Sequence, residues 1–149
     1  MKSKYALGLA LAAMSLVLVV RAPADAPAGQ YTIDATAGTV TDTKTALVWQ
    51  RDVPASTYTW DGAKSYCSSL TLAGGGWRLP SMKELQTVVD RTRTSPAIDL
   101  TAFPNTPSDY FWTSSAVSGS SGYAWFVSFG YGSPLDAGVG SNLRVRCVR

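Results

Sequence analysis

The chain has 149 residues, 46% of them hydrophobic and 15% charged, with a formal net charge of +3 at pH 7. It contains two cysteines and no histidine. The absence of histidine excludes Ser-His-Asp and Cys-His catalysis and leaves no zinc site of the usual His and Cys kinds. The length is enough for one domain with its own hydrophobic core.

The first 24 residues have the parts of a secretory signal peptide. Two lysines precede an apolar run from Ala6 to Val20, and small residues follow at positions 22–24. This run is shorter than the roughly 20 residues that a membrane-spanning helix needs. We therefore expect residues 1–24 to be a signal peptide and the product to reach the periplasm, the cell envelope or the medium. The alternative is an uncleaved amino-terminal anchor, which Arg21 favours slightly.

Removal of this segment changes the charge of the protein. Lys2, Lys4 and Arg21 are three of the 13 basic residues, which leaves ten basic against ten acidic residues from Asp25 onward. A nearly neutral protein gives no support for nucleic-acid binding, and we expect membrane association only through an uncleaved anchor. Residues 25–30 are interpreted as a linker and residues 31–149 as the domain.

The domain begins with a predicted hairpin and a predicted helix. Two short apolar runs flank residues 42–45, which predicts a β hairpin that supplies Val40, Leu47 and Trp49 to a core. In the next segment apolar residues recur at helical spacing, and Thr59 is a plausible N-cap. The residues on this inward stripe are Trp60, Ala63, Cys67 and Leu70.

The stretch "GGGWRLPSMKEL" (74–85) is interpreted as a junction between two helices. The glycines let the chain turn, and Pro80 favours an extended segment at residues 77–79. Ser81 and Glu84 have the spacing of a capping box for a second helix ending near Arg91. The alternative is that Trp77 or Arg78 also contacts a ligand. The residues with an expected structural role are Trp77, Arg78, Pro80, Ser81 and Glu84.

The second half favours strands and loops. Residues 95–115 predict a long ordered loop that enters a strand at Tyr110, and the alternation in 123–129 places Tyr123, Trp125, Val127 and Phe129 on one face. A last strand directs Leu143, Val145 and Cys147 inward, so Arg144 and Arg146 are expected to point the other way, side by side. The glycine-rich segment 130–142 between these strands is expected to be a surface loop.

The two cysteines fit an exported protein with a disulfide. Cys67 and Cys147 are the only possible intramolecular pair. By the chain-entropy model a loop of this size contributes roughly 4.5 kcal/mol.

A series of ordered motifs runs from about Thr39 to the end of the chain. The motifs are Leu47-Val48-Trp49, Trp60-x-x-Ala63-x-x-x-Cys67, Trp77-Arg78-Leu79-Pro80-x-x-x-Glu84-Leu85, Phe103-Pro104-x-Thr106, Trp112-x-Ser114-Ser115, Trp125-x-Val127-x-Phe129 and Arg146-Cys147-Val148-Arg149. Together they resemble the Lcl C-terminal domain family, which is named for the end of a bacterial collagen-like adhesin.

This family is similar to the C-type lectin-like superfamily. The resemblance implies an α+β fold in which two helices flank short, mainly antiparallel strands, with a bridge between Cys67 and Cys147. It also implies that the long ordered loop region of the second half is the ligand surface. The family name suggests binding to sulfated polysaccharide and host surfaces.

The chain departs from relatives of this kind in two ways. It has no Gly-x-y repeats, so a collagen-type trimer is not implied. The segments closest to calcium-dependent sugar motifs, Phe103-Pro104-Asn105 and Trp125-Phe126-Val127, lack the carboxylates that calcium needs. We expect no metal and no cofactor.

Six residues are candidate ligand contacts. Arg144 and Arg146 would form a fork for sulfate or carboxylate, and the alternative is ion pairing with Asp99, Asp109 or Asp136. Exposed aromatic rings would stack on sugars, and carboxylates would bind hydroxyls. The set is Arg144, Arg146, Tyr131, Asp136, Tyr110 and Asp109.

The resulting hypothesis is an exported, non-catalytic recognition module that binds a glycan or a surface protein. One alternative is an enzyme similar to the sulfatase-activating oxidase branch of the lectin-like group, which would use a cysteine pair. An acid pair such as Asp99 and Asp136 for glycoside hydrolysis is not demanded by the spacing. A structural envelope component is the third possibility.

Overall fold

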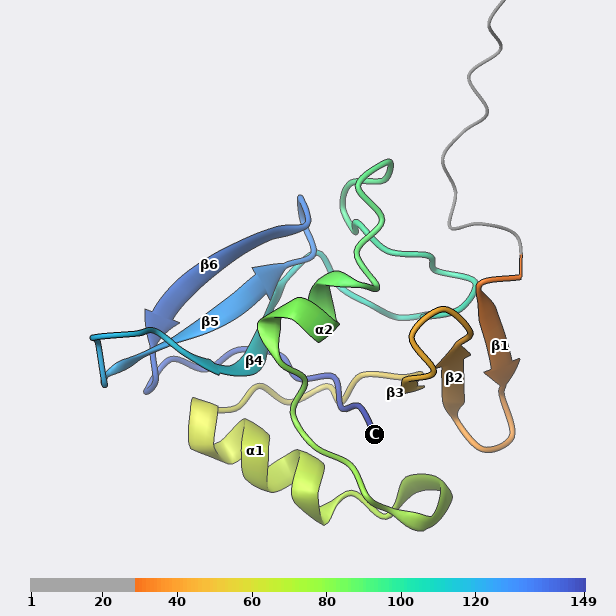
Figure 1. Ribbon diagram of the computed structural model, residues 1–149, viewed down its shortest axis with the longest axis horizontal. Coiled ribbons are helices and arrows are strands. Elements are labelled where there is room, and N and C mark those ends of the chain that lie inside the picture. Colours follow the sequence, from red (N-terminus) through yellow and green to blue (C-terminus); the bar gives the residue numbers. More distant parts are fainter. Residues whose placement is uncertain (1–28) are drawn as a thin grey trace, which may run out of the picture.

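The computed structural model describes residues 29–149 (Figure 1). The proposed signal peptide and most of the proposed linker therefore lie outside the described residues. The elements in chain order are β1 (Tyr31–Asp34), β2 (Thr39–Asp42), β3 (Val48–Gln50), α1 (Trp60–Ser69), the 3-10 turn η1 (Leu72–Gly74), α2 (Met82–Gln86), β4 (Tyr110–Ala116), β5 (Tyr123–Ser128) and β6 (Ser133–Gly138).

The strands form two antiparallel three-stranded sheets, in the orders β1-β2-β3 and β4-β5-β6. The predicted hairpin is confirmed, because β2 pairs with β3 and places Val40 opposite Trp49. Both of these side chains are fully buried. β1 adds an edge strand that the sequence analysis did not predict. The domain is thus a small mixed fold with two sheets and few helices, consistent with the α+β class.

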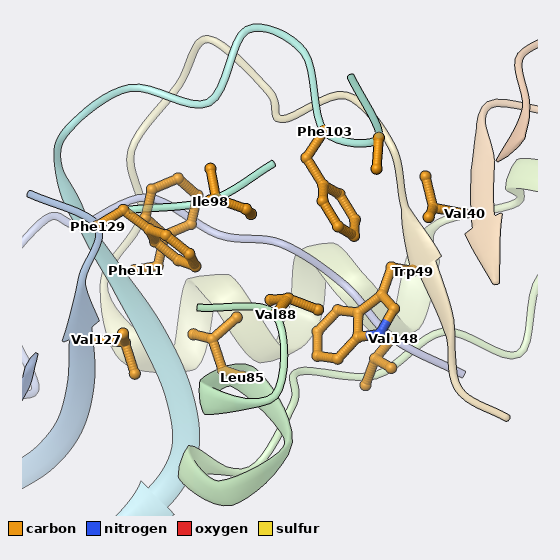
Figure 2. Close-up of a cluster of buried hydrophobic side chains, with 11 residues drawn as sticks. Val40, Trp49, Leu85, Val88, Ile98, Phe103, Phe111, Val127, Phe129 and Val148 are labelled. Carbon is orange, nitrogen blue, oxygen red and sulfur yellow. The ribbon is translucent and has the colours of Figure 1, made fainter. Parts of the chain in front are cut away.

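The sheet β4-β5-β6 has a buried core on each face. α1 packs against β4, and α2 packs against β4 and β5. The α2-side core, drawn in Figure 2, contains Val40, Trp49, Leu85, Val88, Ile98, Ala102, Phe103, Phe111, Val127, Phe129 and Val148. The α1-side core contains Ala63, Cys67, Trp77, Leu79, Trp112, Ala124, Phe126, Val145 and Cys147.

This double covering corrects the expectation for the strand at 123–129. Val127 and Phe129 face the α2-side core as expected, but Ala124 and Phe126 on the opposite face are buried too. Tyr123 is 50% exposed. Alternation identifies the two faces of a strand, and a strand buried on both faces has no polar face to mark the outer one.

The expectation of a surface loop at 130–142 is wrong in part, because residues 133–138 form β6. This strand pairs with β5 over its whole length, from Ser128↔Ser133 to Tyr123↔Gly138. Pro134 and the half-exposed Leu135 lie on it. An edge strand tolerates proline and a polar composition, so the glycine-rich sequence resembled a loop.

The first helix begins as predicted, and the second is shorter than predicted. The Thr59 hydroxyl accepts a hydrogen bond from the Gly62 N–H at 3.3 Å. α2 ends at Gln86 rather than near Arg91. Beyond it, the Val89 N–H donates to the Gln86 carbonyl, and the Asp90 N–H donates to Ala97 of the following loop. These hydrogen bonds take the place of the i to i−4 bonds of a longer helix, so the chain leaves the axis of α2 after Gln86.

The junction 74–85 is built as the sequence predicted. The Ser81 side chain accepts from the Glu84 N–H at 3.3 Å, and Glu84 Oε2 accepts from the Ser81 N–H at 2.8 Å, which completes the capping box. Arg78 donates to both Glu84 carboxylate oxygens, at 2.8 and 2.6 Å. Trp77 and Pro80 are buried, and the Trp77 indole N–H donates to the Leu72 carbonyl at 2.7 Å.

The predicted disulfide is present between Cys67 and Cys147, with Cα atoms 5.5 Å apart. Both cysteines are fully buried in the α1-side core. The bridge therefore fastens α1 to the last segment of the chain.

Candidate functional site

The last segment, residues 143–149, alternates between the two cores. Leu143, Val145 and Cys147 pack in or against the α1-side core, while Val148 belongs to the α2-side core. The inward placement of these three residues is confirmed, but the predicted last strand is wrong. The segment forms only isolated bridges, because it pairs in turn with different parts of the chain, at Tyr58, Phe111 and Trp49. The opposite side of the segment, which carries Arg144 and Arg146, is covered by other parts of the protein and is not open to solvent along its length.

Arg146 is fully buried, so the expectation that it points to the surface beside Arg144 is wrong. Its Nη1 donates to the carbonyls of Gln50 and Arg51 at 2.6 and 2.7 Å. Its Nη2 donates to the Thr106 hydroxyl at 2.6 Å. The guanidinium also lies over the Phe103 ring, 4.7 Å from its centroid.

Arg146 therefore joins three parts of the chain that are distant in sequence. Burial lowers the pKa of its guanidinium to about 9, an effect that the nearby Asp52 carboxylate opposes. The hydroxyl that it contacts donates in turn to the Phe103 carbonyl at 2.8 Å. Arg146 therefore links the end of β3 to the loop that contains Thr106.

Arg144 is partly exposed and forms an ion pair with Asp109. The distance from Arg144 Nε to Asp109 Oδ2 is 3.1 Å, and Arg144 Nη1 donates to the Ala55 carbonyl. Asp109 Oδ1 accepts from the Tyr110 N–H at 2.8 Å, which fixes the carboxylate. Of the two alternatives for Arg144, the structure shows the ion pair with Asp109.

A shallow, open pocket of about 360 Å³ lies beside this ion pair. Most of its lining is apolar, and Asn105 and Arg144 supply the polar groups. Asn105 has a φ of 57° and its side-chain amide lies 3.4 Å from Asp52 Oδ1, which connects the two walls. The lining residues are Val53, Pro54, Ala55, Asn105, Pro107 and Arg144.

Comparison with protein families identifies the chain. The profile of the Lcl C-terminal domain matches residues 38–149. The chain belongs to the Lcl C-terminal domain family. A search of curated proteins gives no match.

The other candidate residues of this Lcl C-terminal domain lie away from the pocket. Tyr110 is 47% exposed, but its ring packs on Phe126, whose side chain faces the α1 side of the sheet. Tyr131 is 76% exposed in the turn between β5 and β6. Asp136 is exposed on β6, where it pairs with Trp125. Only Arg144 and Asp109 come together at the pocket.

Two further charged residues of the Lcl C-terminal domain, Asp99 and Arg149, have local structural contacts. Asp99 accepts from the Thr101 N–H at 2.8 Å within a turn. Arg149 lies over the Trp77 ring and donates to the Ala73 and Gly75 carbonyls. Within residues 29–149 no group of three or more acidic or cysteine side chains is placed to hold a metal ion.

Sequence reasoning missed the walls of the pocket. Residues 53–55 and Pro107 carry no reactive groups, and in the sequence Asn105 stands out only as part of a segment close to a calcium motif. The available signal was the presence of proline in both segments, Pro54 in "DVPA" and Pro104 and Pro107 in "FPNTP". Proline restricts the backbone, and binding residues are disproportionately on well-positioned loops, but the pattern does not show which loops meet.

Proposed function

We propose that this Lcl C-terminal domain is a non-catalytic recognition module that binds a glycan in the pocket beside Arg144. The observation that carries the proposal is the composition of the pocket, which combines an apolar lining with the Arg144–Asp109 pair at its edge. Ligand pockets are mostly apolar with a few placed polar groups. A sugar ring offers a complementary surface, since it has an apolar C–H face and hydroxyls around its rim.

We also propose that the fold is a compact variant of the C-type lectin-like fold. Three features support this: a helix cysteine is bonded to the last segment, two helices lie on opposite faces of an antiparallel sheet, and a long loop separates α2 from β4. That loop runs toward β1 and returns to β4 (Figure 1), and it supplies Asn105 and Pro107 to the pocket.

The state of the cysteines favours recognition over an oxidase-type activity. A redox enzyme needs a reactive cysteine that its substrate reaches, in a partially exposed environment. Cys67 and Cys147 are bonded to each other, and both are fully buried in a core. Their placement fits a structural bridge.

A glycan array probed with the purified protein tests the proposed function. We expect saccharide binding that weakens about tenfold, or ~1.4 kcal/mol, in Arg144→Gln. Arg91→Gln is the matched control, because Arg91 is exposed and does not line the pocket. Equal affinity in both variants would move the binding surface away from the pocket. Binding to surface proteins but to no saccharide would replace the glycan proposal.

We further propose that the protein is exported. Mass spectrometry of the protein recovered outside the cytoplasm tests this. A mature amino terminus at Asp25 is expected, and an intact Met1 start in the cytoplasmic fraction would contradict it.

A further inference from the structure

Two of the three guanidinium nitrogens of Arg144 are already hydrogen-bonded within the protein. Arginine recognises sulfate best through two parallel N–H groups that are free to approach the same anion. Here Nε is paired with Asp109 at 3.1 Å, and Nη1 donates to the Ala55 carbonyl. The Nε edge of the guanidinium is thus occupied by a carboxylate, so a sulfate group finds no free fork at that edge, while Nη2 keeps its donors.

The second arginine expected at this surface does not contribute a donor. Arg146 is fully buried, and its Nη groups are directed to the Gln50 and Arg51 carbonyls and the Thr106 hydroxyl. A ligand in the pocket therefore meets one arginine instead of two.

Two exposed carboxylates border the same pocket. The Asp109 side chain is 41% exposed and lies against the lining residue Arg144. The Asp52 side chain is 55% exposed and lies 3.4 Å from the amide of the lining residue Asn105. Either carboxylate would repel a sulfate group in the pocket, because like charges at short range disfavour association.

The same groups suit hydroxyls. A hydroxyl both donates and accepts hydrogen bonds, whereas sulfate only accepts. The pocket edge offers donors on Arg144 and Asn105 next to acceptors on Asp109 and Asp52. The lining by Val53, Pro54, Ala55 and Pro107 suits the apolar face of a sugar ring.

We propose that the pocket binds uncharged sugars through pairs of hydroxyls and discriminates against sulfated ones. This inference rests on the proposed glycan recognition and adds the charge class of the ligand. The sequence alone indicates a sulfate-binding fork of two arginines. The structure does not provide this fork, because Arg146 is buried and Arg144 is paired with Asp109.

The first test is an array that carries each oligosaccharide in an uncharged and a sulfated form, probed at 50 and 300 mM salt. We expect the uncharged member of a pair to bind at least tenfold more tightly, with an affinity that hardly changes with salt. Preferential binding of the sulfated members, weakening steeply with salt, would overturn the inference and leave glycan recognition standing. Binding to no member of either set would overturn both.

Asp109→Asn gives a second test, in which the change in affinity has opposite signs for uncharged and for sulfated ligands. For an uncharged sugar, the substitution removes an acceptor and frees Arg144 to move, so we expect affinity for the array's uncharged ligand to fall about tenfold. For a sulfated ligand, the substitution removes a repulsive charge and frees the arginine fork, so affinity would rise.

Asp136→Asn is the matched control for this test. It makes the same charge change at an exposed position on β6, which does not line the pocket. The melting temperature of each variant establishes that it is folded. Tighter binding of sulfated ligand by Asp109→Asn, with Asp136→Asn unchanged, would contradict the inference.

Discussion

The junction 74–85 and the pocket are built from similar residues but differ in how they are assembled. Each contains an arginine paired with a carboxylate, together with proline. In the junction, Arg78 and Glu84 are six residues apart, and the same carboxylate also completes the capping box of α2. At the pocket, Arg144 and Asp109 are 35 residues apart, and a third segment supplies the Ala55 carbonyl.

The most conspicuous sequence motif, the junction, therefore has a structural role, whereas the pocket is formed by less conspicuous residues. The junction uses its polar groups internally: the Trp77 indole, the Arg78 guanidinium and the Glu84 carboxylate all have local partners. At the pocket three segments distant in sequence meet, and Arg146 of the disulfide-linked last segment hydrogen-bonds two of them, at Arg51 and Thr106. Substitutions in the long-range links should affect the pocket, and substitutions in the junction should affect stability alone.

Removal of the disulfide has the largest expected effect. The bridge closes a loop with a sequence separation of 80, so the double variant Cys67→Ser/Cys147→Ser should lose about 4–5 kcal/mol of unfolding free energy. Urea denaturation of both proteins measures the loss. A loss below about 1 kcal/mol would show that the last segment is held by the cores alone.

Replacement of Arg146 comes next and affects the pocket as well as stability. Arg146→Met leaves buried acceptors on Gln50, Arg51 and Thr106 without their donor, so we expect a loss of about 2–4 kcal/mol and a loosened pocket. Hydrogen exchange of the amides in 51–55 and 105–109 measures the loosening. Arg91→Met is the control, because Arg91 is exposed and does not line the pocket, and it should change the unfolding free energy by less than about 0.5 kcal/mol. Equal protection in both variants would contradict a positioning role for Arg146.

The capping box provides a smaller and purely structural effect. Ser81→Ala removes the acceptor of the Glu84 N–H and should lower the unfolding free energy by about 1 kcal/mol. Glycan affinity should stay unchanged, since Ser81 does not line the pocket. A variant of unchanged stability that no longer binds would reverse the assignment of the two regions.

The smallest predicted effect is the acid dependence of the junction. The hydrogen bonds from Arg78 lower the pKa of Glu84 to about 2, although its partial burial acts in the opposite direction. A lowered folded-state pKa stabilises the protein above the unfolded value, and this contribution disappears as the pH falls from about 4.5 to 2. Because the pair is partly solvated, we expect a difference of at most about 1 kcal/mol between wild type and Glu84→Gln across this range. Unfolding free energies that fall by the same amount in both proteins over this pH range would contradict the prediction.

The sequence predicted the local features well and the long-range ones poorly. The Thr59 cap, the Ser81–Glu84 box and the Val40–Trp49 hairpin depend on neighbours a few residues away, and all three are confirmed. The disulfide was also predictable, because two cysteines allow only one pair.

Two of the errors share one physical cause, which is that alternation does not show what covers an extended segment. Leu143 and Val145 point as predicted, yet the opposite side holds a second core rather than solvent. Arg146 was therefore expected at the surface and is buried. The same covering explains why Ala124 and Phe126 were not recognised as core residues.

The central claim is that the ligand surface lies where segments 53–55 and 105–109 meet Arg144. NMR chemical-shift mapping with the tightest saccharide from the array tests it most directly. We predict that the largest shifts fall on residues 53–55, 105–109 and 144, and that residues 74–85 do not respond. Shifts concentrated in the junction, or on the Tyr110 ring and Leu135 across the sheet, would contradict the claim.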